Sequence, residues 1–224
     1  MVIKISINPF VDFELSSNAK KLRIIKDQKN PNPIRVGWYQ TPRASIKKSL
    51  SQNGDQLPLL EGIERLKNKI ISKPQQLKNK MVSLEALDHF VAIKLPTILK
   101  NHQYEVIKET EIKSLIIDNV EIIVSPDVVF KIDLNGKTFI GAIKLHLSKN
   151  NVFNLEQSLT VSTLLHQYCL SLSDKYELEV LPELCYSVDV FGERIVSAPI
   201  NAKPYLLKIR NICKEVKKYW ITAA

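Results

Sequence analysis

Apolar and polar residues follow two different periods along the C-terminal two thirds of the chain. Apolar residues three or four positions apart over 82–100 predict a helix, which Pro96 is expected to kink. Runs rich in β-branched residues come next, and each of them predicts a strand. The predicted strands are 104–108, 112–118, 121–132 and 138–148. Asp118-Asn119 and Asn135-Gly136 favour tight turns, so neighbouring strands should be antiparallel.

Helical spacing returns after the last of these strands. Asn154 fits an N-cap with Gln157 three residues later, a capping-box pattern that predicts the start of a helix. Residues 184–191 and 194–198 predict two more strands around Gly192, and residues 205–220 predict a closing helix. This order predicts an α/β fold of the α+β kind, with one central mixed sheet flanked by helices.

The first 80 residues lack this regularity because six prolines interrupt them. Short helices are predicted there at 17–27, 42–53 and 57–71, where apolar and basic residues are interspersed. The chain should therefore divide into a basic, mainly helical N-terminal region, 1–80, and a core domain, 81–224.

The charge of the chain is concentrated in its first part. The 224 residues carry a net charge of +9, and 45% of them are hydrophobic, as in a folded globular protein. Residues 1–80 hold 16 Lys and Arg against 6 Asp and Glu, a balance of +10, whereas 81–224 hold 16 against 17, a balance of −1. Such asymmetry indicates a nucleic-acid surface, since basic residues near phosphates release counterions. A solvated surface or a docking site for an acidic protein partner has the same composition.

Basic and aromatic residues coincide around residue 38. Arginines there can contact phosphates, while Trp38 and Tyr39 can stack on an unpaired base. Alternatively, the two aromatic rings pack the N-terminal region onto the core domain. The predicted nucleic-acid contacts are Arg35, Trp38, Tyr39, Arg43, Lys47 and Lys48.

The sequence lacks the motifs of several classes of functional site and the features of membrane or secreted proteins. Cys169, Cys185 and Cys213 lie too far apart for a zinc motif and are expected to be free buried thiols. The chain has no glycine-rich phosphate loop, no G-x-S-x-G and no H-E-x-x-H pattern. No run approaches the roughly 20 apolar residues of a membrane span, and the N-terminus lacks signal-peptide features, so a cytoplasmic location without a membrane partner is expected.

One pair of strands carries the candidate chemistry. Pro126-Asp127 lies within the third predicted strand, and Ala142-Ile143-Lys144 lies in the next one, with positions 142 and 144 on the same face. With the order of elements over about 81–200, these residues resemble the metal-dependent nuclease core of the PD-(D/E)XK superfamily. In that family Pro-Asp begins one strand and Asp/Glu-x-Lys lies in the next, so Ala142 replaces an acidic residue here.

The resemblance implies a nuclease that hydrolyses DNA phosphodiester bonds with Mg²⁺ or Mn²⁺, in restriction, repair, mobile-element processing or phage defence. It assigns metal binding to Asp127, and orientation of water or stabilisation of charge to Lys144. Glu156, in the first turn of the following helix, is the candidate for the missing metal ligand. An acidic residue at that position is also favoured by the helix dipole alone.

Ala142 leaves a second hypothesis open, because a methyl group cannot bind a hard cation. The chain would then be a catalytically inactive nuclease-fold subunit that binds nucleic acid or a protein partner within a larger complex. A third hypothesis is a protein-interaction domain. Asp127 with Lys144 could then be a purely structural ion pair.

Three other residues have both a functional and a structural interpretation. His146 could be a metal ligand or a general base, or simply a packed histidine. Glu85 matches the place of another acidic residue in many family members, but Glu85 and His89 could equally be a pair on the helix surface.

Overall fold

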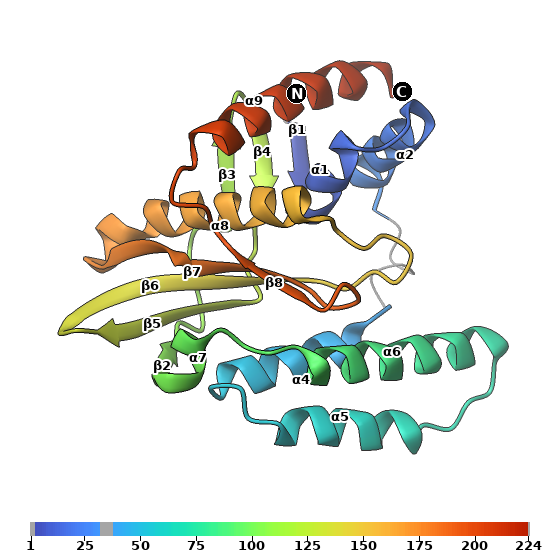
Figure 1. The fold of residues 1–224 in the computed structure, drawn as a ribbon. Helices are drawn as coiled ribbons and strands as arrows, with labels where there is room; N and C mark the ends of the chain where they lie inside the picture. The colour runs from blue at the N-terminus through green and yellow to red at the C-terminus, as the bar shows by residue number, and fades with distance from the viewer. Residues whose placement is uncertain (1–2, 32–37, 224) are drawn as a thin grey trace.

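The computed structural model describes residues 3–31 and 38–223, and it has an α/β fold with two mixed sheets. Figure 1 shows its layers: α8 runs between the three-stranded and five-stranded sheets, and a group of helices covers the far side of the larger sheet. The fold class predicted from the sequence is thus confirmed, with two sheets in place of one. No helix in the described ranges is long and apolar enough to cross a bilayer.

The larger sheet has the strand order β2-β5-β6-β7-β8. Its strands are β2 Tyr104–Val106, β5 Val128–Leu134, β6 Lys137–His146, β7 Glu179–Asp189 and β8 Arg194–Ser197. Strands β6 and β7 are parallel, and the other neighbours are antiparallel. A parallel pair needs a long crossover, which helix α8 (Leu155–Tyr176) provides.

The smaller sheet contains a strand from the N-terminal region. Its order is β1-β4-β3, with β1 Ile3–Ser6 parallel to β4 Val120–Ile123 and β3 Ser114–Ile117 antiparallel to it. The prediction of one strand over 121–132 is wrong, because the chain turns at Ser125, whose φ is 36°, and Pro126 follows. The two halves of that run belong to different sheets.

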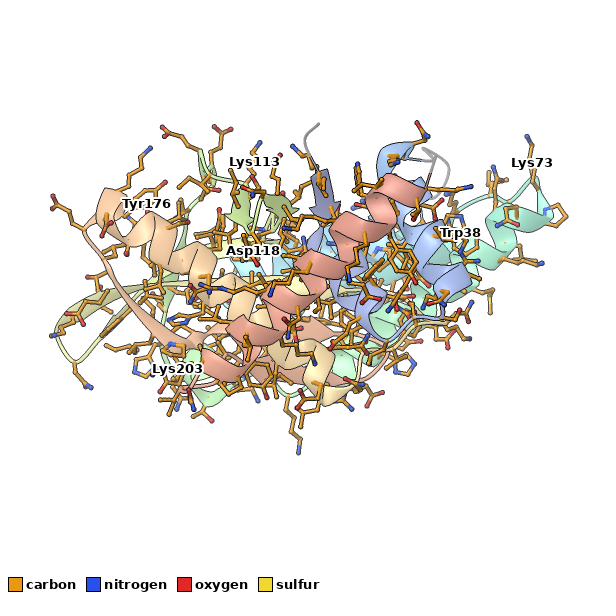
Figure 2. The ribbon with its side chains drawn as sticks, turned by 90° about the horizontal axis from the view of Figure 1, so that it is seen from above. Trp38, Lys73, Lys113, Asp118, Tyr176 and Lys203 are labelled. Atoms are coloured by element: carbon orange, nitrogen blue, oxygen red, sulfur yellow. The ribbon has the colours of Figure 1, made fainter. Side chains whose placement is uncertain are left out.

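Each face of the larger sheet carries its own hydrophobic core. Alternation along β6 sends Ile140 and Ala142 into one core and Ile143 and Leu145 into the other. The first core includes the smaller sheet, α8 and three more helices, α1 Ile7–Glu14, α2 Asn18–Lys29 and α9 Lys203–Thr222. Figure 2 shows α9 crossing over α8. The second core is built with α4 Gln40–Ser51, α5 Leu57–Lys67, α6 Pro74–Ala92 and α7 Thr97–Asn101.

The proposed boundary at residue 80 does not match this arrangement. Residue 80 lies inside α6, and the elements before it are divided between the two faces of the larger sheet. Both faces of a central sheet must be covered, and the N-terminal helices supply part of each cover. The helix predicted over 82–100 also has other limits in the structure. Helix α6 begins at Pro74 and ends at Ala92, and α7 follows as a separate short helix.

Candidate functional site

Asp127 immediately precedes β5 and is buried, with 7% of its surface exposed. Its backbone N–H donates to the carbonyl of Ile143 at 2.8 Å, so the strand pairing fixes its position. Its Oδ1 accepts a hydrogen bond from Arg43 Nη1 at 2.5 Å, and its Oδ2 accepts one from the N–H of Leu145 at 2.8 Å. Both oxygens of this carboxylate therefore have protein donors.

Lys144 reaches the same corner from the neighbouring strand. Its Nζ lies 3.8 Å from Asp127 Oδ2 and donates to the carbonyl of Ser125 at 2.5 Å, with 12% of the side chain exposed. Burial lowers the pKa of Lys144 to about 8; Asp127 opposes this shift, whereas the nearby positive charges of Arg43 and Lys47 add to it. The Asp127 and Lys144 side chains therefore lie next to each other, as the alternation along the strand predicts.

Helix α4 brings two of the predicted nucleic-acid contacts to this corner. Arg43 and Lys47 are four residues apart and share one helix face. Lys47 is exposed and, with Asp127, lines a cavity of about 380 Å³, which we call the Lys47 cavity. Lys48 instead pairs with Glu61 of α5 at 3.2 Å. Lys47 and Lys48 therefore have different surroundings, although both were predicted from the sequence to contact nucleic acid.

The two aromatic rings pack against each other, with centroids 6.5 Å apart, and Tyr39 also packs against the core domain. The Tyr39 ring lies 5.8 Å from that of Phe191, and its hydroxyl accepts a hydrogen bond from the N–H of Lys149 at 3.3 Å. Tyr39 therefore joins the helical layer to the β7–β8 turn, as the packing alternative predicts. Trp38 is partly exposed and lines a cavity over α6. Arg35, the remaining predicted contact, lies outside the described residues.

Glu156 is not brought to Asp127. It lies in the first turn of α8 with 58% of its side chain exposed, and its Oε2 is 3.5 Å from Lys208 Nζ of α9. Lys208 also pairs with Glu14 at 3.1 Å. The carboxylate of Glu156 thus belongs to an ion-pair group between α1, α8 and α9.

The residues present do not fit a Mg²⁺ or Mn²⁺ centre. Such a cation takes several oxygen ligands, whereas Ala142 is fully buried among apolar residues and both oxygens of Asp127 accept protein hydrogen bonds. Among residues 3–31 and 38–223, no group of three or more His, Cys, Asp and Glu is placed to hold a metal. The predicted pairing of Asp127 with Glu156 as metal ligands has no geometric basis in the structure.

The remaining histidine candidate is a packed residue. His146 Nε2 lies 2.6 Å from the carbonyl oxygen of Asn151, and its ring stacks on Phe153 at 3.6 Å. Burial lowers the pKa of His146, which favours the neutral imidazole at physiological pH. At the surface, Glu85 pairs with Lys149 at 2.7 Å, and His89 contacts Glu193 at 2.7 Å. Within the part of the chain that the structure describes, none of these side chains makes a hydrogen bond or ion pair with Asp127.

Two residues that no sequence motif singles out also lie near the corner. Lys108, just beyond β2, lines the Lys47 cavity. Asn8, at the start of α1, donates from Nδ2 to the carbonyl of Leu145 at 3.2 Å. No motif marks either residue, because the contacts join segments up to 137 residues apart.

Neither a scan against protein-family models nor a search of curated proteins found a match for this chain. The resemblance to the PD-(D/E)XK core therefore depends on the motif residues and the order of elements alone.

Proposed function

We propose that the protein binds nucleic acid through the corner around Asp127 and does not hydrolyse it. The observation that carries this proposal is the gathering of positive charge at the corner: Arg43, Lys47 and Lys144 lie near the carboxylate of Asp127. Such a surplus of positive charge attracts a phosphate group, and an exposed lysine such as Lys47 can contact it directly.

The order β5, β6, α8, β7 supports a nuclease-like origin for this core, since Asp127 and Lys144 lie on adjacent strands as in the resemblance. Ala142 and the distant Glu156 argue against hydrolysis, because they leave Asp127 without an acidic partner. The protein would then act as a catalytically inactive, nucleic-acid-binding subunit, with DNA as the expected ligand and protein partners in a larger complex.

Metal-dependent DNA cleavage is the second candidate, favoured by the separation of 3.8 Å between Lys144 Nζ and Asp127 Oδ2. It is tested by incubating plasmid and single-stranded DNA with the protein and Mg²⁺ or Mn²⁺. We expect no cleavage above background. Cleavage by the wild type that disappears in the Asp127→Ala, Lys144→Ala double variant would establish the nuclease and overturn the inactive assignment.

The binding proposal is tested by fluorescence anisotropy of labelled DNA over a series of salt concentrations. Lys47→Gln should weaken binding and reduce the slope of log K against log salt by about 1, since one phosphate contact is lost. Lys48→Gln is the matched control, because Lys48 is engaged with Glu61 and should leave both quantities unchanged. Equal effects of the two substitutions would contradict the proposed contact. Absence of binding at low salt would instead favour an acidic protein partner.

A further inference from the structure

The outward face of α9 carries positive charge that the overall balance of residues 81–224 does not reveal. Those residues hold 16 Lys and Arg against 17 Asp and Glu. Residues 203–222, which form α9, hold 6 against 1, so the rest of 81–224 holds 10 against 16. Four of the six cations are four or seven positions apart and so share one helix face. We call Lys203, Arg210, Lys214 and Lys218 the α9 stripe.

The side chains of the α9 stripe are exposed. Within residues 3–31 and 38–223, none of them makes an ion pair or a hydrogen bond. The charged residues of α9 that do pair with opposite charges lie off the stripe: Glu215 pairs with Lys21 at 2.6 Å, and Lys208 pairs with Glu14 at 3.1 Å. Like charges four residues apart repel each other and destabilise a helix. An anionic partner would neutralise this charge.

The remaining faces of α9 decide which class of anionic partner fits. Ile209, Val216 and Trp220 are buried in the hydrophobic core, so the helix has no free apolar face of the kind that membrane-surface helices insert into lipid. Leu207 and Ile221 are exposed but lie fourteen positions apart. Interfaces between proteins are depleted in lysine and have a more apolar centre than this surface. These features favour a nucleic acid over a membrane or a protein.

The shape of the α9 stripe favours a duplex. Lys203 and Lys218 are fifteen residues apart in one continuous helix, so at about 1.5 Å of rise per residue the stripe is about 22 Å long. Duplex DNA carries about one negative charge per 1.7 Å of its axis and is stiff over roughly 500 Å. Its phosphates can therefore lie along a rigid line of cations, whereas a flexible single strand would first have to be straightened.

The α9 stripe is separate from the Asp127 corner. Helices α4 and α9 lie on opposite sides of the larger sheet (Figure 1), and Figure 2 shows α9 as the outer element on its side, with Lys203 at one end. We infer that the stripe is a second surface that binds the phosphate backbone of duplex DNA, so that one molecule can hold two duplexes. The stripe requires nothing of the corner, whereas holding two duplexes also depends on the proposed function.

The stripe is tested by anisotropy of a short labelled duplex over a series of salt concentrations. A background of Lys47→Gln weakens the corner, so that binding to α9 can be measured. In this background the double substitution Lys214→Gln, Lys218→Gln, which we call the stripe variant, should reduce the slope of log K against log salt by about 2, since two phosphate contacts are lost. Both lysines are exposed, so the fold should be retained.

The matched control is the double substitution Lys137→Gln, Lys175→Gln, which removes the same charge. Both lysines are exposed but pair with Glu179 and Glu111, so the slope should not change. Equal reductions in the control and the stripe variant would mean that only net charge matters and would overturn the inference. An unchanged slope in the stripe variant would do the same. Binding to phosphatidylserine vesicles without binding to the duplex would assign the stripe to membranes and also overturn it.

Capture of a labelled duplex by a bead-bound duplex tests whether one molecule holds both. The wild type should capture the labelled duplex, and the stripe variant and Lys47→Gln should each reduce capture. If the stripe variant keeps full capture while Lys47→Gln loses it, two molecules are joined through their corners and the inference is overturned. If the stripe variant lowers the salt slope but Lys47→Gln has no effect on binding or capture, the stripe stands and the proposed function fails.

Discussion

The Asp127 corner and the start of α8 each hold a carboxylate that the family resemblance linked to metal binding, yet the two carboxylates differ in burial and in their hydrogen-bond donors. Asp127 is 7% exposed and accepts hydrogen bonds from Arg43 and Leu145. The Glu156 side chain is 58% exposed, and its Oε2 lies 3.5 Å from Lys208 Nζ at the surface. The difference shows that the surroundings of a carboxylate decide what it can do. The buried carboxylate of Asp127 holds the side chains of Arg43 and Lys144 close together.

The largest expected difference between these regions is in stability. Asp127→Ala should lower the free energy of unfolding by about 3–5 kcal/mol, because it leaves Lys144 buried near other cations without its carboxylate. Glu156→Ala should lower it by less than about 0.5 kcal/mol, since an exposed ion pair contributes little. Urea unfolding measures both values. Equal losses would show that the two carboxylates are structurally equivalent after all.

The next effect concerns the pH dependence that Lys144 gives to the Asp127 corner. Its pKa is about 8 in the folded protein against 10.5 for the ordinary group, so between these values the unfolded state binds more protons. Stability should therefore rise with pH across this window, by up to about 3 kcal/mol from this group, and Lys144→Met should remove the rise. Unfolding free energies at pH 7 and 10 check this.

Lys137→Met is the matched control for Lys144→Met, because Lys137 is on the same strand with 64% of its side chain exposed. The control should keep the pH dependence of the wild type. If Lys144→Met kept it as well, Lys144 would not be the group that titrates in this window.

The smallest effect distinguishes two residues at the start of α8. Asn154 accepts a hydrogen bond from the N–H of Gln157 at 2.8 Å and completes a capping box. Asn154→Ala should lower the free energy of unfolding by about 1 kcal/mol, whereas Glu156→Gln should change it by a few tenths. Thermal or urea unfolding of the two variants tests this order. The reverse order would mean that Glu156 has a larger part in the structure than its exposure indicates.

Much of the local structure could be predicted from the sequence because it depends on neighbouring residues. The capping box at Asn154 and the turns at Asp118-Asn119 and Asn135-Gly136 are present, with φ between 47° and 78° at the four turn residues. The buried free cysteines were also predicted correctly. Each of these features is determined by short-range geometry or by residue type alone.

The break at Ser125 was not predictable from periodicity, because β-branched residues continue on both sides of it. Which strand pairs with which depends on contacts across the whole chain, as the parallel pairing of β1 with β4 shows. The same limit applies to the candidate site. The alternation along β6 placed Lys144 correctly beside Asp127, but the approach of Arg43 and Asn8 involves segments 84 and 137 residues away.

The sequence by itself determined the α/β class, most of the helices and strands, the concentration of positive charge in the first 80 residues and the pairing of Asp127 with Lys144. Only the tertiary structure decided that Arg43 and Lys47 face this pair and that Lys48 and Glu156 do not. The physical reason is that periodicity and capping act over a few residues, whereas burial and charge pairing depend on which distant segments the fold brings together.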